Sequence, residues 1–489
     1  MKYLFTNLLI ICILFTSCSI NSDQKQIQKN NPAQQLDSLI TYSHNNGMFN
    51  GSIAILKNDT LVFNQSYGYV NKNSKNKINA ETIFYIASIS KQFTAMGIMM
   101  LQEKGLLDYD DSIDKYLPEL TSINKNITIR NLLQHTSGIS DRMYYQIKDP
   151  DNQDVVDKLK TLEDSSIGNP NKQFSYSNTG YVLLALIIEK VSGTTIGDFF
   201  QKEIFNPLDM RRTTTSKEKF ATDNNRAYPY NILGLASTYN SSVIGPAGIY
   251  SSVNDLIKWN SGIRHNKLIS SKTMELAFTN GTIEGKEISY KLGNDEFGYG
   301  FGWSPFVKNN DNYVRHDGST EGYRSLIQKN LSKNIDVILL TNHGGALAMD
   351  EITYGIDQIL ENQIYVKPNI PLPNKIINKL HQEDIHTVVK MLKETLNQDN
   401  KPDERVLGRL GYTMQNNGKI QEAIELYKIN LELYPESTNC LYVLGEVYVS
   451  EKQYELAKNI YDRFLKITPN SKYVIEKLKL IDNEMGKNN

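Results

Sequence analysis

The chain has 489 residues and carries 53 Lys and Arg against 54 Asp and Glu, a net charge of -1 at neutral pH. This balance gives no general electrostatic attraction to nucleic acid, so we expect no nucleic-acid partner. Three cysteines are too few for a disulfide framework, and the chain has no H-E-x-x-H pattern. We therefore expect no metal and no cofactor. The length predicts more than one folded domain.

The N-terminus is typical of an exported protein. One lysine precedes an apolar run from Leu4 to Phe15, which is too short to span a bilayer and predicts a secretory signal. Cys18 follows in a context that resembles a bacterial lipobox, so we predict a lipoprotein signal peptide over residues 1–18 and a lipid on Cys18. A plain cleaved signal with an incidental cysteine is the alternative. The Asn- and Gln-rich residues 19–35 predict a flexible tether in a cell-envelope protein that faces the periplasm or the surface.

Turn and strand signals at both ends of the next region predict one antiparallel sheet. Residues 51–56 and 61–68 flank an Asn58-Asp59 turn, which indicates a hairpin. A meander is expected over 297–305, 312–316, 323–328 and 335–340. Helical patterns lie between, including 91–104 before Gly105 and 181–191 before Gly193. The pattern predicts an α+β fold, an antiparallel sheet flanked by helices with a helical insertion.

Ser88 and Lys91 form an S-x-x-K motif at the start of a predicted helix. Residues three apart share one helix face, so the amine can reach the hydroxyl and, once deprotonated, take its proton. Lysine acts as a base only where burial or a nearby cation lowers its pKa. Ser88 as an ordinary N-cap, with Lys91 solvated, is the competing interpretation.

Two further motifs supply partners for this pair. Tyr176-Ser177-Asn178 precedes an apolar helix, and its first and third side chains are expected to face one cleft. His316-Asp317-Gly318 ends a predicted strand, where the glycine lets a substrate backbone approach. The Ser319 N–H that follows, together with the Ser88 N–H, would form an oxyanion hole. Ordinary turn residues and a surface histidine are the alternatives for these segments.

In this order, the motifs resemble the serine β-lactamase and penicillin-binding-protein superfamily, in particular its class C β-lactamase-like and D,D-peptidase-like branch. The likeness spans roughly Leu36 to Gly345. Flanking segments carry the same resemblance: Phe84 to Ala87, Leu132 to Gly138, Gly245 to Ile249 and Gly298 to Trp303.

The resemblance implies a role for each motif residue. Ser88 would be the acylated nucleophile, Lys91 its activating amine, and Tyr176 a proton shuttle with phenolate character promoted by Lys91. Asn178 would hold the substrate amide, and His316, Gly318 and Ser319 would also contact substrate. His316 stands where many relatives carry Lys, and histidine offers less positive charge at neutral pH. This departure favours the esterase and peptidase members over a dedicated β-lactamase.

Other polar clusters receive structural interpretations. His135 is expected in a buried, hydrogen-bonded turn near the cleft rather than in a catalytic role. Residues 342–345 are expected either to line the far wall of the cleft or to form a simple strand-ending turn. The acidic run at Asp108, Asp110, Asp111 and Asp114 lacks the Gly and Glu of a calcium loop, so we expect a solvated loop.

The C-terminal region changes character after Pro368, Pro371 and Pro373. A set of residues recurs 34 positions later: Leu407, Leu410, Gly411, Met414, Ala423, Tyr427 and Pro435 return as Leu441, Leu444, Gly445, Tyr448, Ala457, Tyr461 and Pro469. These units resemble tetratricopeptide repeats, an all-α domain in which small residues let two helices cross closely. The array is expected to dock on the hydrolase region or on a protein partner through a peptide-binding groove; a structural appendage is the alternative.

We therefore predict five segments: 1–18 signal peptide, 19–35 tether, 36–362 serine hydrolase domain, 363–400 Pro-containing linker and helix, and 401–489 repeats. The predicted activity is serine hydrolysis of an amide or ester through an acyl-enzyme, on D-amino-acid peptides, β-lactams or short esters. The alternative is a non-catalytic adaptor or sensor of the same fold. Intact Ser88, Lys91 and Tyr176 argue against it.

Overall fold

The computed structural model describes residues 31–72, 75–120, 123, 126–142, 144–162, 167–238, 242–292 and 295–487. The predicted signal peptide and the lipidation site at Cys18 lie outside these residues. Within the described part of the chain, none of the helices combines the length and apolarity that crossing a membrane requires.

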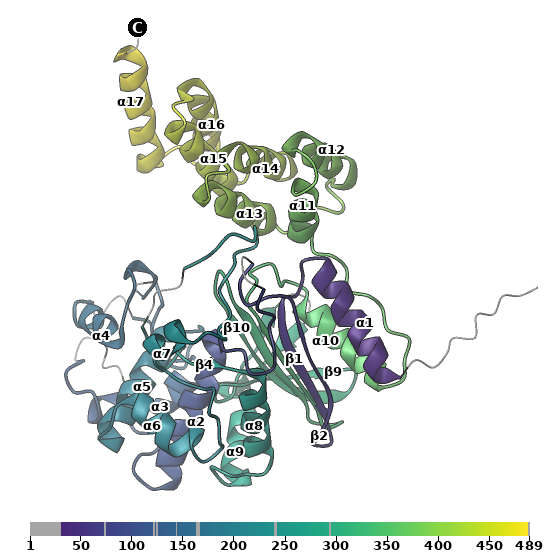
Figure 1. The fold of residues 1–489 in the computed structure, drawn as a ribbon. Coiled ribbons are helices and arrows are strands. Elements are labelled where there is room, and N and C mark those ends of the chain that lie inside the picture. The colour runs from purple at the N-terminus through teal and green to yellow at the C-terminus, as the bar shows by residue number, and fades with distance from the viewer. Residues whose placement is uncertain are drawn as a thin grey trace, which may run out of the picture.

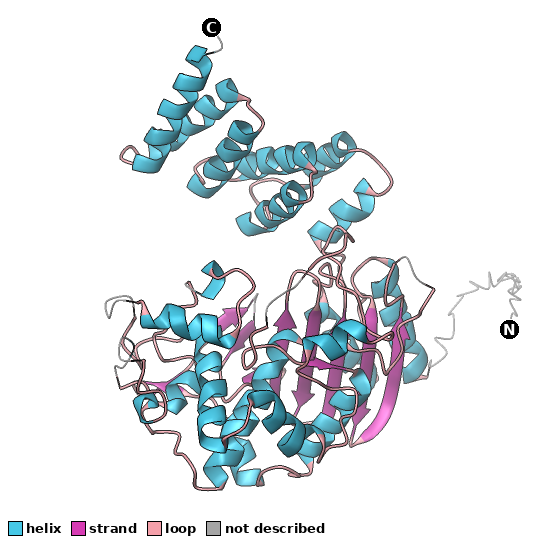
Figure 2. Ribbon diagram, turned by 60° about the vertical axis from the view of Figure 1, so that its left-hand side comes forward, coloured by secondary structure: helices cyan, strands magenta, loops and turns pink. Residues whose placement is uncertain are grey.

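A six-stranded antiparallel sheet with strand order β2-β1-β12-β11-β10-β9 forms the centre of the larger domain (Figures 1 and 2). The strands are β1 (Gly51–Lys57), β2 (Thr60–Tyr67), β9 (Ser304–Lys308), β10 (Asp311–Ser319), β11 (Arg324–Asn330) and β12 (Ile335–Thr341). Because β1 pairs with β12, both ends of the domain build one sheet, as the sequence predicts. Positive φ angles of 48° and 63° at Asn58 and Asp59 form the predicted hairpin turn.

The two faces of the sheet carry different helices (Figure 1). On one face lie α1 (Pro32–Asn45) and α10 (Met349–Leu360), which bury Leu36, Leu39 and Ile352 against the sheet. The helical insertion covers the other face and contains α2 (Ser90–Glu103), α3 (Ile129–Leu133), α4 (Asn152–Lys160), α5 (Asn178–Ser192), α6 (Ile196–Phe200), α7 (Lys217–Thr222), α8 (Val253–Arg264) and α9 (Ser271–Phe278). The prediction of a sheet with a helical insertion is confirmed.

Short elements complete the insertion. They are the 3₁₀ turns η1 (Ala87–Ile89), η2 (Ile113–Lys115) and η4 (Tyr144–Gln146), the π-turn η6 (Gln201–Phe205), and the strand pairs β3 (Phe84–Tyr85) with β4 (Tyr250–Ser251), β5 (Thr282–Ile283) with β6 (Lys286–Glu287), and β7 (Tyr290–Leu292) with β8 (Asp295–Phe297). The small β3–β4 ladder matters most, because η1 follows it directly.

Two sequence predictions need correction. A single strand was expected over 297–305, but β8 ends at Phe297 and β9 begins at Ser304. Glycines cause the break: Gly302 has φ 73°, and a Cβ at Gly300 would lie 2.2 Å from the Ala277 carbonyl oxygen. The predicted tether over 19–35 also extends too far, since α1 begins at Pro32 with the Asn31 side chain capping it.

The C-terminal region is all-helical, as predicted. It contains α11 (Leu372–Leu380), α12 (Ile385–Thr395), α13 (Glu404–Asn416), α14 (Ile420–Leu433), α15 (Thr438–Ser450), α16 (Tyr454–Ile467) and α17 (Lys472–Lys487). The repeated glycines explain the close helix pairs, because a Cβ at Gly411 would lie 2.6 Å from the Tyr427 ring and one at Gly445 would lie 2.5 Å from the Tyr461 ring.

The helical domain docks on the hydrolase domain through polar and apolar contacts. In α11, Asn374 Nδ2 donates to the carbonyl oxygens of Gly47 at 2.9 Å and Gly345 at 2.8 Å. Leu233, from a loop of the helical insertion, is 6% exposed and belongs to the hydrophobic core of the repeats. The short repeat array was expected to dock on the hydrolase region or on a partner, and in this structure it docks on the hydrolase domain of the same chain.

Candidate active site

The predicted nucleophile sits in a strained turn between β3 and α2. Ser88 lies in η1, and the preceding Ala87 has φ 48°, in the left-handed region that a residue with a Cβ seldom adopts. Such strain costs about 1–3 kcal/mol and persists only where surrounding structure imposes it. Here β3 holds the turn on one side and α2 on the other, so Ser88 is fixed and partly exposed.

Lys91 lies one helical turn from Ser88 and is fully buried. Its Nζ atom is 3.2 Å from Ser88 Oγ, 2.8 Å from Asn178 Oδ1 and 2.9 Å from the carbonyl oxygen of Pro246. The two carbonyl-type oxygens are acceptors only. When Lys91 is a neutral amine, its two N–H groups therefore serve Asn178 and Pro246, and its lone pair remains for the Ser88 hydroxyl.

The environment makes the neutral amine accessible near neutral pH. Burial lowers the pKa of Lys91 from 10.5 to about 7, although the negative charges of Asp141 and Asp317 oppose the shift. Desolvation disfavours the charged form of a buried lysine, and the oxygens bonded to this one, from Ser88, Asn178 and Pro246, are all neutral. The requirement for a lysine base is met by burial alone.

Tyr176 borders the same cleft. The Lys91 Nζ atom lies 4.7 Å from the centroid of its ring. Tyr176 is 38% exposed, yet the surrounding cleft walls desolvate its phenol. This desolvation raises the pKa of Tyr176 well above 10, and a hydrogen bond with Ser88 opposes the shift only in part. This raised pKa favours the protonated phenol, and Lys91 approaches the face of the ring. The predicted role of Tyr176 as a proton shuttle stays a prediction.

Asn178 forms the first turn of α5 and links the Lys91 amine to the helix. Its Nδ2 donates to the Tyr145 hydroxyl at 3.0 Å. Asp141 holds this end of α5, because its carboxylate accepts from the N–H groups of Asn178 at 2.7 Å and Thr179 at 2.9 Å. A carboxylate at a helix N-terminus is favourable. The Asn178 amide is therefore fixed, with its oxygen already bonded to Lys91.

His316 reaches the cleft from β10 and is 5% exposed. Its Nδ1 lies 2.8 Å from the carbonyl oxygen of Asp317, so Nδ1 carries the proton, and its Nε2 then accepts from the Tyr299 hydroxyl at 3.0 Å. Burial and the charge of Lys91 lower the pKa of His316 to about 4, against the opposing charge of Asp317. A pKa in this range favours the neutral imidazole at pH 7, in line with the lack of assured positive charge that the sequence predicts.

Gly318 brings β10 against the nucleophile turn. A Cβ at this position would lie 2.4 Å from the carbonyl oxygen of Ile86 and 3.1 Å from the Ala87 Cβ. The close backbone approach predicted for this glycine therefore involves η1 itself, whereas the sequence interpretation assigned it to a substrate. Any side chain here would push β10 away from Ser88.

Ser319 presents its backbone at an open sheet edge. On one side, β10 pairs with β9 only as far as Arg315 opposite Ser304. On the other side, Thr320 N donates to Tyr323 O, so the adjacent Ser319–Arg324 pair is a non-hydrogen-bonded pair, in which the N–H groups point away from the partner strand. The Ser319 N–H therefore points off the edge of β10, as an oxyanion donor requires. Its side chain accepts from Arg324.

The structural interpretations of the other polar clusters hold. His135 is fully buried, its Nδ1 accepts from the Ser177 N–H at 3.0 Å, and burial lowers its pKa well below 6.5. Residues 342–345 form a strand-ending turn, in which Asn342 Nδ2 donates to Tyr228 O and Gly344 N donates to Tyr230 O. In the acidic loop, Arg130 pairs with Asp110 and Lys115 pairs with Asp111.

Sequence reasoning missed several contributors to the site. Pro246 and Tyr299 lie in flanking segments that carry the resemblance. Nothing local indicates that the Pro246 carbonyl accepts from Lys91 or that the Tyr299 hydroxyl donates to His316. Asp141 and Tyr145 have no sequence signal, because their partner Asn178 lies 37 and 33 positions away.

Comparisons with known proteins identify the family of both parts of the chain. The profile of the β-lactamase family matches residues 36–360, and that of the tetratricopeptide repeat matches 438–471. Penicillin-binding protein 4* of Bacillus subtilis (strain 168) is 31% identical over 374 residues, which cover 71% of this chain and 80% of the relative.

Solved structures show the same fold. The octameric penicillin-binding protein homologue from Pyrococcus abyssi has a TM-score of 0.60 and 27% identity, over 73% of this chain and 81% of that chain. The D-amino acid amidase from Ochrobactrum anthropi SV3, in complex with D-phenylalanine, has a TM-score of 0.57 and 20% identity, over 68% and 98% of the two chains. The chain belongs to the β-lactamase and penicillin-binding-protein superfamily and carries a C-terminal tetratricopeptide repeat.

Proposed function

We propose that this chain is a serine hydrolase that acylates Ser88 with an amide or ester substrate and releases the acyl group to water. The observation that carries the proposal is the buried Lys91 amine, whose two carbonyl neighbours orient its lone pair toward Ser88 Oγ at 3.2 Å. Its pKa of about 7 leaves a large neutral fraction at neutral pH.

Acylation follows from these positions. Ser88 Oγ attacks the substrate carbonyl carbon as its proton passes to Lys91 Nζ, and the carbonyl π electrons move to the oxygen. The Ser88 and Ser319 N–H groups stabilise this oxyanion. When the carbonyl re-forms, the bond from its carbon to the leaving nitrogen or oxygen breaks, and the leaving group takes the Tyr176 phenolic proton. The Lys91 ammonium then returns the proton that it took from Ser88 to the Tyr176 oxygen. Water attack repeats the sequence in reverse and restores Ser88.

The neutral state of His316 supports a preference among substrates. With its pKa at about 4, this side chain offers no cation to a free substrate carboxylate, while the neighbouring Asp317 adds negative charge. We infer that short esters and amides, including D-amino-acid derivatives, are better substrates than β-lactams. The D-amino acid amidase and class C β-lactamase neighbours support the fold and leave both chemistries open.

Intact-mass analysis after exposure to benzylpenicillin and to p-nitrophenyl acetate tests the proposal. We expect one acyl adduct on the native chain and none on Ser88→Ala or Lys91→Ala. Ser90→Ala is a matched control, because this neighbouring serine is buried and accepts from Ile249 N at 3.3 Å. Equal labelling of Ser88→Ala would contradict the mechanism.

The lifetime of the adduct separates the two classes of function. Rapid loss with release of product supports an enzyme, and an adduct that persists for hours supports the sensor alternative.

We further propose that Cys18 carries a lipid that tethers the enzyme in the cell envelope, and that the repeats bind a protein partner. Metabolic labelling with a fatty-acid analogue, with Cys18→Ala as the negative control, tests the anchor.

A further inference from the structure

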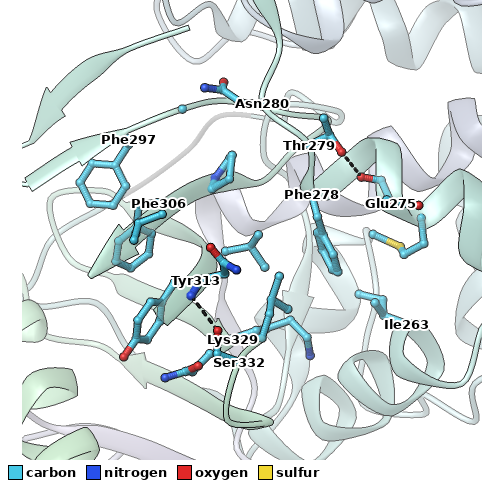
Figure 3. Close-up of a pocket in the computed structure, with 18 of the residues that line it drawn as sticks. Ile263, Glu275, Phe278, Thr279, Asn280, Phe297, Phe306, Tyr313, Lys329 and Ser332 are labelled. Atoms are coloured by element: carbon cyan, nitrogen blue, oxygen red, sulfur yellow. Dashed lines mark hydrogen bonds between the residues drawn. The ribbon is translucent and has the colours of Figure 1, made fainter. Parts of the chain in front are cut away.

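The two ends of the sheet differ in what covers them. At the end where β10 begins, a hollow of about 1190 Å³ borders Phe297, Phe306 and Tyr313 (Figure 3), and every residue of its wall belongs to the hydrolase domain. At the end where β10 finishes, the repeat domain docks on the hydrolase domain (Figure 1). The candidate oxyanion residue Ser319 lies at this second end.

Strand pairing places the repeat domain close to the acylation site. Ser319 lies opposite Arg324, and Arg324 lies opposite Thr341 in the next strand. The carbonyl oxygen of Gly345, four positions after Thr341, accepts from Asn374 of α11 at 2.8 Å. The last residue of β10 and the docking surface of the helical domain therefore share one end of the sheet.

A loop of the helical insertion joins the two domains at this end. Pro229 packs against the β10–β11 turn, since a Cβ at Gly322 would lie 2.4 Å from the Pro229 Cβ. Two residues further on, Asn231 Nδ2 donates to Asn417 Oδ1 at 3.4 Å, just after α13 ends. Leu233 of the same loop enters the core of the repeats. These contacts hold α13 beside the β10–β11 turn.

Two arginines, one from each domain, meet at this junction. Arg324 is partly exposed, and its Nη1 donates to the neutral Ser319 hydroxyl. Arg409 of α13 is exposed. Burial lowers the pKa of Arg324, the charge of Asp317 opposes the shift, and the positive charge of Arg409 adds to it. The two guanidinium groups therefore repel each other, which is unfavourable unless an anion neutralises them.

The acidic side chains whose charges act on this pair have other partners. Hydrogen bonds from Arg405 lower the pKa of Asp403, and the charge of Arg409 contributes. The two Asp403 oxygens accept from Arg405 Nε at 2.8 Å and Nη2 at 2.7 Å. Asp317 lies 3.7 Å from Arg315. The arginine pair therefore keeps positive charge for a ligand.

Open space adjoins Arg409 on the side of the repeats. A hollow of about 320 Å³ between α13, α14 and α15 is lined by Arg405, Arg409, Tyr412 and other neutral side chains, and none of the described residues in its wall is acidic. A carboxylate binds a guanidinium through two parallel hydrogen bonds, which makes this pairing stronger than one with a neutral group. The junction therefore favours a carboxylate.

We propose that the substrate of Ser88 carries a carboxylate far from its scissile bond, and that Arg324 and Arg409 bind this carboxylate. The inference rests on the function proposed above. It gives the repeat domain a part in substrate selection, since Arg409 comes from α13. The low pKa of His316 favours a neutral imidazole beside the scissile bond, so the arginine pair supplies the cation instead.

Steady-state hydrolysis of two matched ester pairs by the full chain tests the proposal. In the first pair, mono-p-nitrophenyl adipate carries a carboxylate on its acyl group, and its methyl ester is neutral. In the second pair, p-acetoxybenzoate carries a carboxylate on its leaving group, and its methyl ester is neutral. After correction for the hydroxide-catalysed rates, we expect kcat/KM to favour the charged ester about tenfold or more in at least one pair. That pair identifies the side of the substrate that bears the charge.

Charge variants of the two arginines locate the preference. Arg324→Gln and Arg409→Gln should each reduce it about tenfold. Arg409→Glu should reduce it further, because the new carboxylate would itself bind Arg324. Arg211→Gln is the matched control and should keep the native preference, since the Arg211 side chain is 83% exposed and pairs with Asp209.

The neutral esters separate this inference from the proposed function. Turnover of the neutral esters with no preference for a carboxylate in either pair would overturn the arginine site and leave the hydrolase standing. A native preference retained in Arg409→Gln would do the same. No turnover of any ester by the native chain would overturn both. Because Arg409 is exposed, its variants decide the question even where Arg324→Gln fails to fold.

Discussion

The Nζ atom of Lys91 lies 2.9 Å from the carbonyl oxygen of Pro246, a residue 155 positions later in the chain. The same segment is tied to the first turn of α2 by two further bonds, from Thr94 Oγ1 to Gly245 O at 2.8 Å and from Ile249 N to Ser90 Oγ at 3.3 Å. The backbone of residues 245–249 therefore sets the orientation of the amine, and burial sets its pKa.

The rate of Ser88 acylation should rise with pH through a midpoint near the Lys91 pKa of about 7. Below this pH the amine is protonated and cannot accept the Ser88 proton, so kcat/KM falls about tenfold for each pH unit. Stopped-flow hydrolysis of an activated ester between pH 5 and 9 measures the profile. A rate independent of pH across this range would exclude Lys91 as the base.

Asn178→Asp should shift that midpoint to higher pH. The substitution keeps the shape of the side chain but places a carboxylate about 3 Å from Lys91 Nζ, where an opposite charge favours the ammonium by about 1–3 pKa units. Activity at pH 7 should fall about tenfold or more and recover at pH 9. Asn152→Asp serves as the control, since Asn152 bonds to the Ile244 backbone instead of to Lys91.

Gly318→Ala should impair both activity and stability. Its Cβ would lie 2.4 Å from Ile86 O and 2.3 Å from Ser325 Oγ, so β10 must move away from η1. Overpacking of this kind costs about 1–3 kcal/mol, and displacement of the Ser319 N–H should lower kcat about a hundredfold. Gly486→Ala, at a position with no atom within 4 Å, is the matched control. Native-like kcat in Gly318→Ala would show that the contact is dispensable.

The free energy of unfolding should depend on pH through Lys91. In the folded chain this group loses its proton above about pH 7, whereas in the unfolded chain it keeps it up to about 10.5. Unfolding between these values takes up a proton, so stability rises with pH there, by at most about 1.4 kcal/mol per unit. Urea denaturation of the native chain and Lys91→Met at pH 6 to 10 measures the difference. An equal pH dependence in both proteins would refute this linkage.

Leu233→Asp should loosen the repeat domain from the hydrolase domain. The side chain is 6% exposed within the repeat core, and an aspartate there would bury an unpaired charge. We expect faster proteolysis between the domains, where residues 363–371 have no helix or strand, while Ser88 labelling persists. Leu235→Asp, at a position that is 40% exposed, should cleave like the native chain.

Much of the fold is predictable because it depends on local patterns. The largely apolar runs at 51–56 and 335–340 indicate strands, and the 34-residue period gives the repeated helix pairs. Gly105 and Gly193 end the predicted helices with φ 69° and 70°. The segment 297–305 fails, since close approach of Gly300 to Ala277 and of Gly302 to α2 outweighs its strand-forming residues.

The sequence by itself determined which residues enter the candidate site, because Ser88, Lys91, Tyr176, Asn178 and His316 lie in ordered motifs. Only the tertiary structure decided their chemical states. Burial lowers the pKa of Lys91 and of His316, and the cleft around Tyr176 raises the pKa of its phenol; these effects come from segments far apart in the chain. Proton affinity depends on the solvent and charge around a group in space, and local sequence does not encode that environment.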